Sequence, residues 1–199
     1  MYRLAQAIAW LLTTVFYRLK RYGGENIPKE GPAILICNHI HMMDVACIIR
    51  QTPRKMRIMA KKELFRNTVI GWFCQKFGAF PISRGEADVS GIRTAMQALH
   101  DGDLLCIFPE GTRNRKREVP LLPLQEGVAM LALRCKAYII PSWVEGGYTP
   151  WNRCRILTGK KMDLSAFAGI RKPTQEQMQQ LTAAIGDALL GCRDELARR

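Results

Sequence analysis

Residues 33–44 read AILICNHIHMMD, and this stretch decides how the rest of the chain is interpreted. Its first part, residues 33–37, is an apolar run with the length of a buried strand. His39 and Asp44 follow, five positions apart. Residues five apart on one regular helix lie about 140° apart around its axis, so these side chains meet only if the chain turns between them. We therefore predict a strand that ends at His39 and a helix that begins near His41, with Asp44 in its first turn.

This arrangement would give His39 and Asp44 the chemistry of a general base. A carboxylate in the first turn of a helix is stabilised by the helix dipole, and it can accept a hydrogen bond from the imidazole. The carboxylate then fixes the tautomer, and the other ring nitrogen can take a proton from a hydroxyl. A histidine at the end of a strand more often satisfies only a local hydrogen bond, so this pair alone leaves both interpretations open.

The length and composition indicate one domain with a hydrophobic core and an anionic partner. The chain has 199 residues, of which 48% are hydrophobic. Thirty Lys and Arg against seventeen Asp and Glu leave a net charge of +13. This excess favours nucleic acid, an anionic membrane face or a phosphorylated substrate over a merely soluble basic protein.

The cysteines argue against a metal site and against export. Seven cysteines are scattered singly without a C-x-x-C pair, so we expect no structural zinc and no other metal. Cys37 and Cys106 lie inside apolar runs, which fits buried thiols in a reducing compartment. No small-residue cleavage site follows the N-terminal apolar stretch, so we predict no cleavable signal peptide.

The N-terminal residues predict an amphipathic helix. Residues 4–17 (LAQAIAWLLTTVFY) are apolar, but a bilayer-spanning helix needs about 20 residues. On a helical wheel one side carries Leu4, Ile8, Leu11, Leu12, Val15 and Phe16, and the other carries Arg3, Gln6, Thr13, Lys20 and Arg21. We predict a membrane-associating helix within residues 1–22, followed by the main domain at 23–199; a helix packed on the core of the domain is the alternative.

The remaining pattern alternates strands with helices. We predict strands at 56–60, 78–84, 104–108, 137–144 and 153–157, and helices at 88–99, 124–134 and 174–196. Pro141 suggests that its strand lies at an edge or ends there. This alternation predicts a single α/β domain with a mostly parallel central sheet flanked by helices, whose ligands bind beyond the carboxyl ends of the strands.

Two stretches remain ambiguous. Residues 64–80 are rich in apolar side chains, which suit either the core or a wall for a lipid chain. Seven basic residues between 50 and 66 form either a solvated face or a docking site for phosphates.

Several chemically useful residues follow predicted strands, so they can converge on one crevice. They are His39, Arg84, and Glu110 to Arg113. Arginine forks suit phosphate oxygens, whereas no nucleophile elbow, metal cluster or Walker-type loop is found in the sequence. This inventory fits transfer of a group to a substrate hydroxyl that His39 activates, on a molecule held by its phosphate.

These residues also carry a family resemblance. The pattern Asn38-His39-x-x-x-x-Asp44, residues 78–84, the hexapeptide FPEGTR at 108–113 and Ile140-Pro141 resemble, in order and spacing, the four motifs of the glycerolipid acyltransferases. The likeness covers residues 30–145 and is greatest for the lysophosphatidate (1-acyl-glycerol-3-phosphate) acyltransferase branch. It implies transfer of an acyl chain from acyl-CoA or acyl-carrier protein to the sn-2 hydroxyl of lysophosphatidate, which forms phosphatidate for phospholipid synthesis.

The resemblance also implies a role for each matching residue. His39 would be the base and Asp44 its orienting partner, with direct attack on the thioester and no acyl-enzyme. The pocket for the glycerol phosphate of the acceptor would be formed by Arg84, Glu110, Gly111, Thr112 and Arg113. Further contacts to phosphate or to the acyl donor would come from Lys61, Lys62 and Pro141. No cofactor is implied, and the N-terminal helix would bind the cytoplasmic face of an anionic membrane peripherally.

Two departures and two alternatives qualify this interpretation. His41 stands where the family often has serine or glutamine, and Pro81 interrupts the apolar run of the second motif. Within the family, the acceptor could instead be glycerol 3-phosphate, a lysophospholipid or a lyso-aminolipid. A non-catalytic basic module that binds membrane or nucleic acid is disfavoured, and no nucleic acid is expected, because the aromatic residues cluster with aliphatic ones rather than alternating with basic ones.

Overall fold

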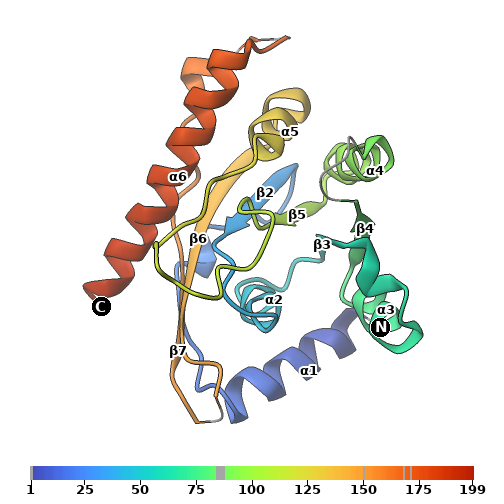
Figure 1. The fold of residues 1–199 in the computed structure, drawn as a ribbon, viewed down its shortest axis with the longest axis vertical. Coiled ribbons are helices and arrows are strands. Elements are labelled where there is room, and N and C mark those ends of the chain that lie inside the picture. The colour runs from blue at the N-terminus through green and yellow to red at the C-terminus, as the bar shows by residue number, and fades with distance from the viewer. Residues whose placement is uncertain (1, 84–87, 150, 168, 171) are drawn as a thin grey trace.

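A computed structural model of the chain describes residues 2–83, 88–149, 151–167, 169–170 and 172–199. These residues form a seven-stranded sheet in the order β1-β7-β6-β2-β5-β3-β4 (Figure 1). The strands are β1 (Lys20–Tyr22), β2 (Ala33–Cys37), β3 (Met56–Lys61), β4 (Ala79–Ile82), β5 (Leu104–Ile107), β6 (Tyr138–Gly146) and β7 (Cys154–Thr158). Strands β6, β2, β5, β3 and β4 run parallel to one another, and β7 is antiparallel to β6. The predicted fold class is confirmed.

Helices cover both faces of the sheet. The longer ones are α1 (Tyr2–Val15), α2 (Asp44–Ile49), α3 (Thr68–Lys76), α4 (Val89–His100), α5 (Gly127–Cys135) and α6 (Gln175–Ala197); short 3-10 helices are η1 (Gly24–Asn26), η2 (Lys62–Phe65) and η3 (Ser165–Phe167). One hydrophobic cluster lies between the sheet and α4, α5 and α6, and a second lies between the sheet and α1 and α2. The sheet is therefore the middle layer of three (Figure 1).

Strand β2 lies in the middle of the sheet because both of its faces are apolar. All five of its residues are buried. Ile34 and Ile36 contribute to the cluster under α4, α5 and α6, whereas Leu35 and Cys37 contribute to the cluster under α1 and α2. This alternation is what a strand buried on both faces requires, and it fixes the point at which the chain emerges toward His39.

The sequence misplaced two features near the site. Helix α2 begins at Asp44 and not near His41, because the Asp44 carboxylate accepts hydrogen bonds from the backbone amides before it and holds them in a turn. The prediction that Pro141 marks an edge strand or a strand end is wrong, since β6 lies between β7 and β2. Pairing of β6 with β7 starts only at Ser142, and the Pro141 carbonyl accepts from the Gly159 amide, so the missing N–H of Pro141 lies where no ladder bond is required.

Helix α1 packs on the domain through the side that the wheel assigned as polar. Ala9 and Thr13 are fully buried, and the Gln6 amide donates to the backbone carbonyl of Pro53 at 3.2 Å. The apolar side chains of Leu4, Leu11 and Val15 are instead exposed to solvent. No helix in the described part of the chain is long and apolar enough to span a bilayer.

Asn38 connects the end of β2 to β6, and its loss should destabilise the fold. The Asn38 side chain donates to the Val144 carbonyl at 2.9 Å and accepts from the Val144 amide at 2.7 Å, both in the buried interior. We expect Asn38→Ala to lower the free energy of unfolding by about 2 kcal/mol or more, because each buried partner left unpaired costs about 1–3 kcal/mol. Urea unfolding measures this. The exposed Asn152→Ala is the matched control, and an equal effect of the two variants would contradict the role of Asn38.

Candidate active site

The turn between β2 and α2 is organised by one carboxylate. Asp44 is fully buried, and its Oδ2 accepts from the amides of Ile40 at 2.7 Å and His41 at 2.8 Å. The same oxygen lies 2.8 Å from Nδ1 of His39. The structure thus brings together the two residues that the sequence proposed as a catalytic pair.

This geometry sets the tautomer of His39. A carboxylate can only accept, so Nδ1 carries the proton and Nε2 keeps a lone pair. The His39 ring stacks on the Phe108 ring, with centroids 3.9 Å apart and planes tilted by 21°. The imidazole is therefore held by a hydrogen bond at one nitrogen and by an aromatic ring on one face, which leaves Nε2 as the candidate base.

The structure adds Tyr148, which the sequence did not single out. Its hydroxyl donates to Oδ1 of Asp44, and its ring stacks on His41 with centroids 4.4 Å apart. Burial, reinforced by the nearby Cys47 and Asp44, raises the pKa of Tyr148 well above its usual range, so the phenol stays protonated and remains a donor. Tyr148 lies two residues after the end of β6, and its position shortly after a predicted strand was the signal that could have identified it.

His41 has surroundings different from those of His39. Its Nδ1 accepts from the Met43 amide at 3.3 Å, and its contact with Asp44 is through the backbone amide. Burial lowers the pKa of His41, the Asp44 charge partly opposes this, and Arg113 and Arg117 lower it further. The structure thus distinguishes the two imidazoles, because the ring of His39 alone is bonded to the carboxylate of Asp44.

Glu110 connects the third motif to the first. It is 4% exposed, its Oε1 accepts from the His39 amide at 2.7 Å, and its Oε2 accepts from the Leu122 amide at 2.9 Å. Burial raises the pKa of Glu110 above its ordinary value, and the two amide hydrogen bonds partly offset this. Asn114 adds a second link, since its backbone N–H donates to the His39 carbonyl at 2.7 Å. Glu110 and Asn114 therefore fix both backbone polar groups of His39.

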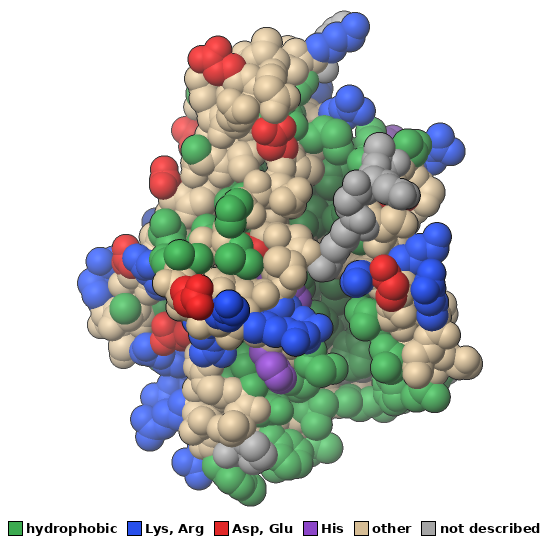
Figure 2. All heavy atoms as spheres, in the orientation of Figure 1, with side chains coloured by type: hydrophobic (Ala, Val, Ile, Leu, Met, Phe, Trp, Pro, Cys, Tyr) green, Lys and Arg blue, Asp and Glu red, His purple; other side chains and the backbone are tan. Residues whose placement is uncertain are grey.

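The other predicted binding residues are distributed differently. Gly111 has φ of +65°, a backbone conformation that favours glycine, and it brings Thr112 and Arg113 onto the loop beside the turn. Arg84 lies outside the described residues. Lys61 and Lys62 are exposed at the junction of β3 and η2, where Lys61 pairs with Glu63 at 3.5 Å. Pro141 lies within β6, level with Ile36. The space-filling view shows basic side chains next to a histidine on one face of the molecule (Figure 2).

An apolar cavity opens beside this loop. Its volume is about 510 Å³, and residues from β3, β4, α4, β5 and α5 line it together with the loop from Phe108 to Thr112. The walls are mainly aliphatic: Met59, Ile82, Ile92, Ile107, Val128, Met130 and Leu131. Phe108 is one of the residues that line this cavity, and its ring stacks on His39, so the cavity and the candidate base share a neighbour.

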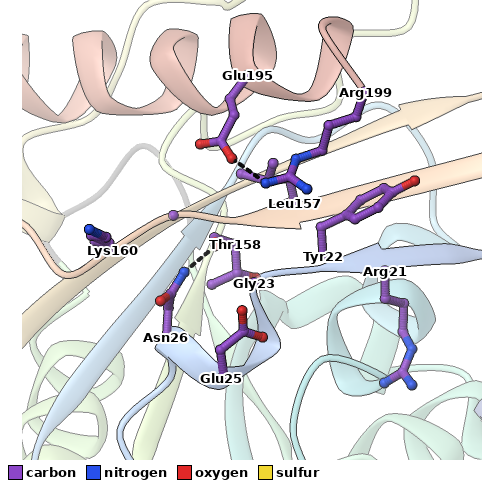
Figure 3. Close-up of a pocket in the computed structure, with 11 residues that line it drawn as sticks. Arg21, Tyr22, Gly23, Glu25, Asn26, Leu157, Thr158, Lys160, Glu195 and Arg199 are labelled. Atoms are coloured by element: carbon purple, nitrogen blue, oxygen red, sulfur yellow. Dashed lines mark hydrogen bonds and ion pairs between the residues drawn. The ribbon is translucent and has the colours of Figure 1, made fainter.

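A second cavity lies elsewhere and has another character. It has a volume of about 460 Å³ and is lined by residues of β1, β7 and α6 (Figure 3). Several of its polar groups bind one another: Arg199 pairs with Glu195 at 2.8 Å, and the Asn26 amide donates to the Thr158 carbonyl at 2.8 Å. None of the proposed catalytic or acceptor-binding residues lines it.

Within the described segments, no group of three or more His, Cys, Asp or Glu side chains is arranged to hold a metal ion. The chemistry available at the turn is thus that of an oriented imidazole, nearby guanidinium groups and an apolar cavity.

Comparison with known proteins identifies the family. The profile of the acyltransferase family matches residues 18–145. The chain belongs to the acyltransferase family. This match begins shortly after α1 and includes the turn of His39 and Asp44, Glu110 to Arg113, and most of β6.

Three relatives within this acyltransferase family share one activity in their names. The 1-acyl-sn-glycerol-3-phosphate acyltransferase of Bacillus subtilis is 29% identical over 89% of this chain and 89% of its own length. Its Streptococcus pneumoniae counterpart is 33% identical over 71% of this chain, and its yeast counterpart is 30% identical over 66%. The matches span 53% and 47% of these two longer proteins. The predicted resemblance to lysophosphatidate acyltransferases is confirmed.

A solved structure shares the fold of this acyltransferase. The 1-acyl-sn-glycerophosphate acyltransferase PlsC from Thermotoga maritima superimposes with a TM-score of 0.76, covering 100% of this chain and 80% of that protein. The two are 22% identical in sequence, so the comparison establishes the fold alone.

Loss of the Tyr148 hydroxyl should slow turnover without weakening substrate binding. Tyr148→Phe keeps the ring that packs on His41 but removes the hydrogen bond to Asp44, so the pair with His39 is less firmly held. We expect kcat to fall about tenfold, the lower end of what a hydrogen bond to a charged group contributes, with both KM values unchanged. Steady-state kinetics for donor and acceptor separately measure this.

Tyr17→Phe is the matched control. Tyr17 packs edge-on against Tyr148, with ring centroids 5.5 Å apart, and its substitution leaves the bond to Asp44 in place. A rise in either KM for Tyr148→Phe, or an equal loss of kcat in the two variants, would contradict a positioning role for the Tyr148 hydroxyl.

Proposed function

We propose that this acyltransferase transfers an acyl chain from acyl-CoA or acyl-carrier protein to the sn-2 hydroxyl of lysophosphatidate and so forms phosphatidate. The observation that carries the proposal is the bond of 2.8 Å between His39 and Asp44, placed beside an apolar cavity and a basic loop. The names of the relatives support the same acceptor.

The mechanism uses His39 as the base. Its Nε2 takes the proton of the sn-2 hydroxyl while the oxygen attacks the thioester carbonyl, and the positive charge that develops on the ring is stabilised by Asp44. Collapse of the tetrahedral intermediate breaks the C–S bond. The thiolate leaves with the proton from His39, which restores the neutral imidazole, and no acyl-enzyme forms.

The basic loop supplies the contacts for the acceptor phosphate. Arg113 is the predicted ligand that lies next to the turn, and its field, with that of Arg117, lowers the pKa of His41. A guanidinium fork binds phosphate oxygens through paired hydrogen bonds. Gly111 and Thr112 line the cavity beside this loop, and we assign them to the glycerol backbone together with Arg84. Glu110 contributes by holding the amide of His39 in place.

The apolar cavity suits an acyl chain. Its volume of about 510 Å³ and its mainly aliphatic walls offer apolar contacts to a hydrocarbon chain. Phe108, whose ring stacks on His39, is one of the residues that line the cavity, so a chain inside it would lie close to the proposed base. The exposed apolar side of α1 supports peripheral attachment to the cytoplasmic face of an anionic membrane, where both lipid substrates partition. No cofactor takes part in this scheme.

Removal of the base should abolish most turnover. We expect His39→Ala to lower kcat about 10²- to 10⁴-fold, the usual contribution of a positioned general base, while the circular dichroism spectrum stays that of the wild type. Release of CoA from acyl-CoA is measured with lysophosphatidate, glycerol 3-phosphate and lysophosphatidylcholine as alternative acceptors.

The neighbouring His41→Ala is the matched control, and its activity should fall less than about tenfold because its ring makes no bond to the Asp44 carboxylate. A wild-type rate in His39→Ala would refute the base assignment. A preference of the wild type for another acceptor would refute lysophosphatidate as the substrate.

Loss of Arg113 should weaken acceptor binding. Arg113→Ala removes a guanidinium from the proposed phosphate site, so we expect the KM for lysophosphatidate to rise about tenfold or more and the KM for acyl-CoA to stay unchanged. Arg115→Ala, an exposed arginine two residues further along the same loop, is the control and should leave both values unchanged. A defect confined to the acyl donor would contradict the assignment.

A further inference from the structure

An exposed apolar surface lies on η2 and α3, in a part of the chain that the proposed chemistry does not use. Five large side chains are exposed there: Leu64, Val69, Ile70, Trp72 and Phe73. Helix α3 packs on η2 through Gly71, where a Cβ would lie only 3.0 Å from the carbonyl oxygen of Phe65 in η2. Gly71 thus faces inward and the large apolar side chains face solvent. An ordinary surface helix shows the opposite arrangement, with its large apolar side chains packed on the core of the domain.

This surface continues along α1. The Tyr2 hydroxyl accepts from the Met56 amide at 3.0 Å, and the Tyr2 ring lies 3.8 Å from the position that a Cβ on Gly78 would take, just past the end of α3. The start of α1 is therefore beside the end of α3. Apolar side chains extend along the lower part of the molecule, where Figure 1 places these two helices (Figure 2).

The other end of α1 reaches the catalytic turn. Tyr17, just after α1, packs against Tyr148, and Tyr148 stacks on His41. Met42, between His41 and Asp44, is 66% exposed. The apolar surface thus extends from α3 along α1 to the residues that hold the base, although these three segments are far apart in the sequence.

Charge identifies the partner of this surface. Basic side chains flank both helices: Arg3, Arg18, Lys20 and Arg21 around α1, and Lys61, Lys62, Arg66 and Lys76 around η2 and α3. The Lys76 ammonium lies 5.5 Å from the centre of the Trp72 ring. Apolar anchors with tryptophan and a basic rim complement anionic headgroups over an acyl layer, whereas protein interfaces are depleted in lysine.

We propose that η2 and α3 form a second membrane-insertion element, which enters an anionic bilayer beside α1 and directs the turn of His39 toward the lipid surface. The inference rests on the proposed function for its lipid substrates. It adds that attachment requires this internal helix as well as the N-terminal one, so that two anchors fix the orientation of the site.

The test replaces apolar side chains that are already exposed, so folding is not at risk. Val69→Ser with Ile70→Ser removes two anchors from α3. Val89→Ser is the matched control, because Val89 is 62% exposed against 65% for Val69 and also lies in the first turn of a helix, α4. Both variants and the wild type are sedimented with vesicles of phosphatidylcholine with or without phosphatidylglycerol.

We expect the double variant to bind the mixed vesicles at least about tenfold more weakly than the wild type, since each buried Val or Ile side chain contributes substantially to partitioning. The control should bind like the wild type, and vesicles without phosphatidylglycerol should bind all three proteins less. Unchanged binding of the double variant would overturn the proposal.

Activity separates this inference from the proposed function. The double variant should keep its rate on lysophosphatidate dispersed in detergent and lose rate on the same substrate in vesicles. Equal rates of the double variant and the wild type on vesicles would overturn the inference and leave the acyltransferase assignment standing. A wild type without lysophosphatidate activity in either assay would overturn the proposed function, whereas the vesicle binding would still decide the role of α3.

Tryptophan quenching tests insertion directly. In a variant with Trp10→Phe and Trp151→Phe, Trp72 is left on the surface and Trp143 is buried in the domain. Lipids brominated on their acyl chains should quench the emission when vesicles bind. Sedimentation with vesicles but no quenching would overturn insertion. The proposal would also be overturned if the wild type were a dimer in solution and Val69→Ser with Ile70→Ser dissociated that dimer while vesicle binding persisted.

Discussion

The site depends on the hydrogen bonds accepted by one buried carboxylate. The Asp44 carboxylate accepts hydrogen bonds from Nδ1 of His39, from two backbone amides of the preceding turn and from the hydroxyl of Tyr148. When a charged group is buried it loses favourable free energy of hydration, and hydrogen bonds from several donors offset much of that loss. The same bonds fold the turn, start α2 and fix the tautomer of the base. Structure and chemistry at this turn therefore share one set of interactions.

The order of the strands determines which groups reach that turn. Strand β2 lies between β6 and β5, so the segments after these two strands approach His39 from either side. Tyr148 comes from the β6 side and donates a hydrogen bond to Asp44. Glu110 comes from the β5 side and accepts a hydrogen bond from the backbone amide of His39. Asn38 ties β2 to β6 immediately before the base. His39 is thus held by contacts from three adjacent strands, as the proposed catalysis by a positioned base requires.

The two sides of the sheet supply different parts of the proposed reaction. The aliphatic cavity lies among β4, β5, α4 and α5, while α1 and α2 lie on the opposite face. Phe108 connects the two environments, because its ring stacks on His39 and packs in the cluster on the α1 and α2 side, while the loop that begins at Phe108 lines the cavity. The basic loop lies beside the turn, and α1 and α3 carry exposed apolar side chains. A lipid chain, its phosphate and the proposed base can therefore occupy neighbouring positions.

The sequence by itself determined the fold class, most strands, the family motifs and the pairing of His39 with Asp44, because hydrophobic periodicity and local spacing are properties of contiguous residues. It also indicated, through the Thr174–Gln177 capping box, where α6 begins. It could not place Pro141, since whether a missing N–H is tolerated depends on where the neighbouring strand starts to pair. Only the tertiary structure decided that Tyr148 reaches Asp44, that Glu110 holds a backbone amide, and that the apolar residues of α3 face solvent. Each of these depends on which strands and helices become neighbours, and long-range packing rather than local pattern sets that.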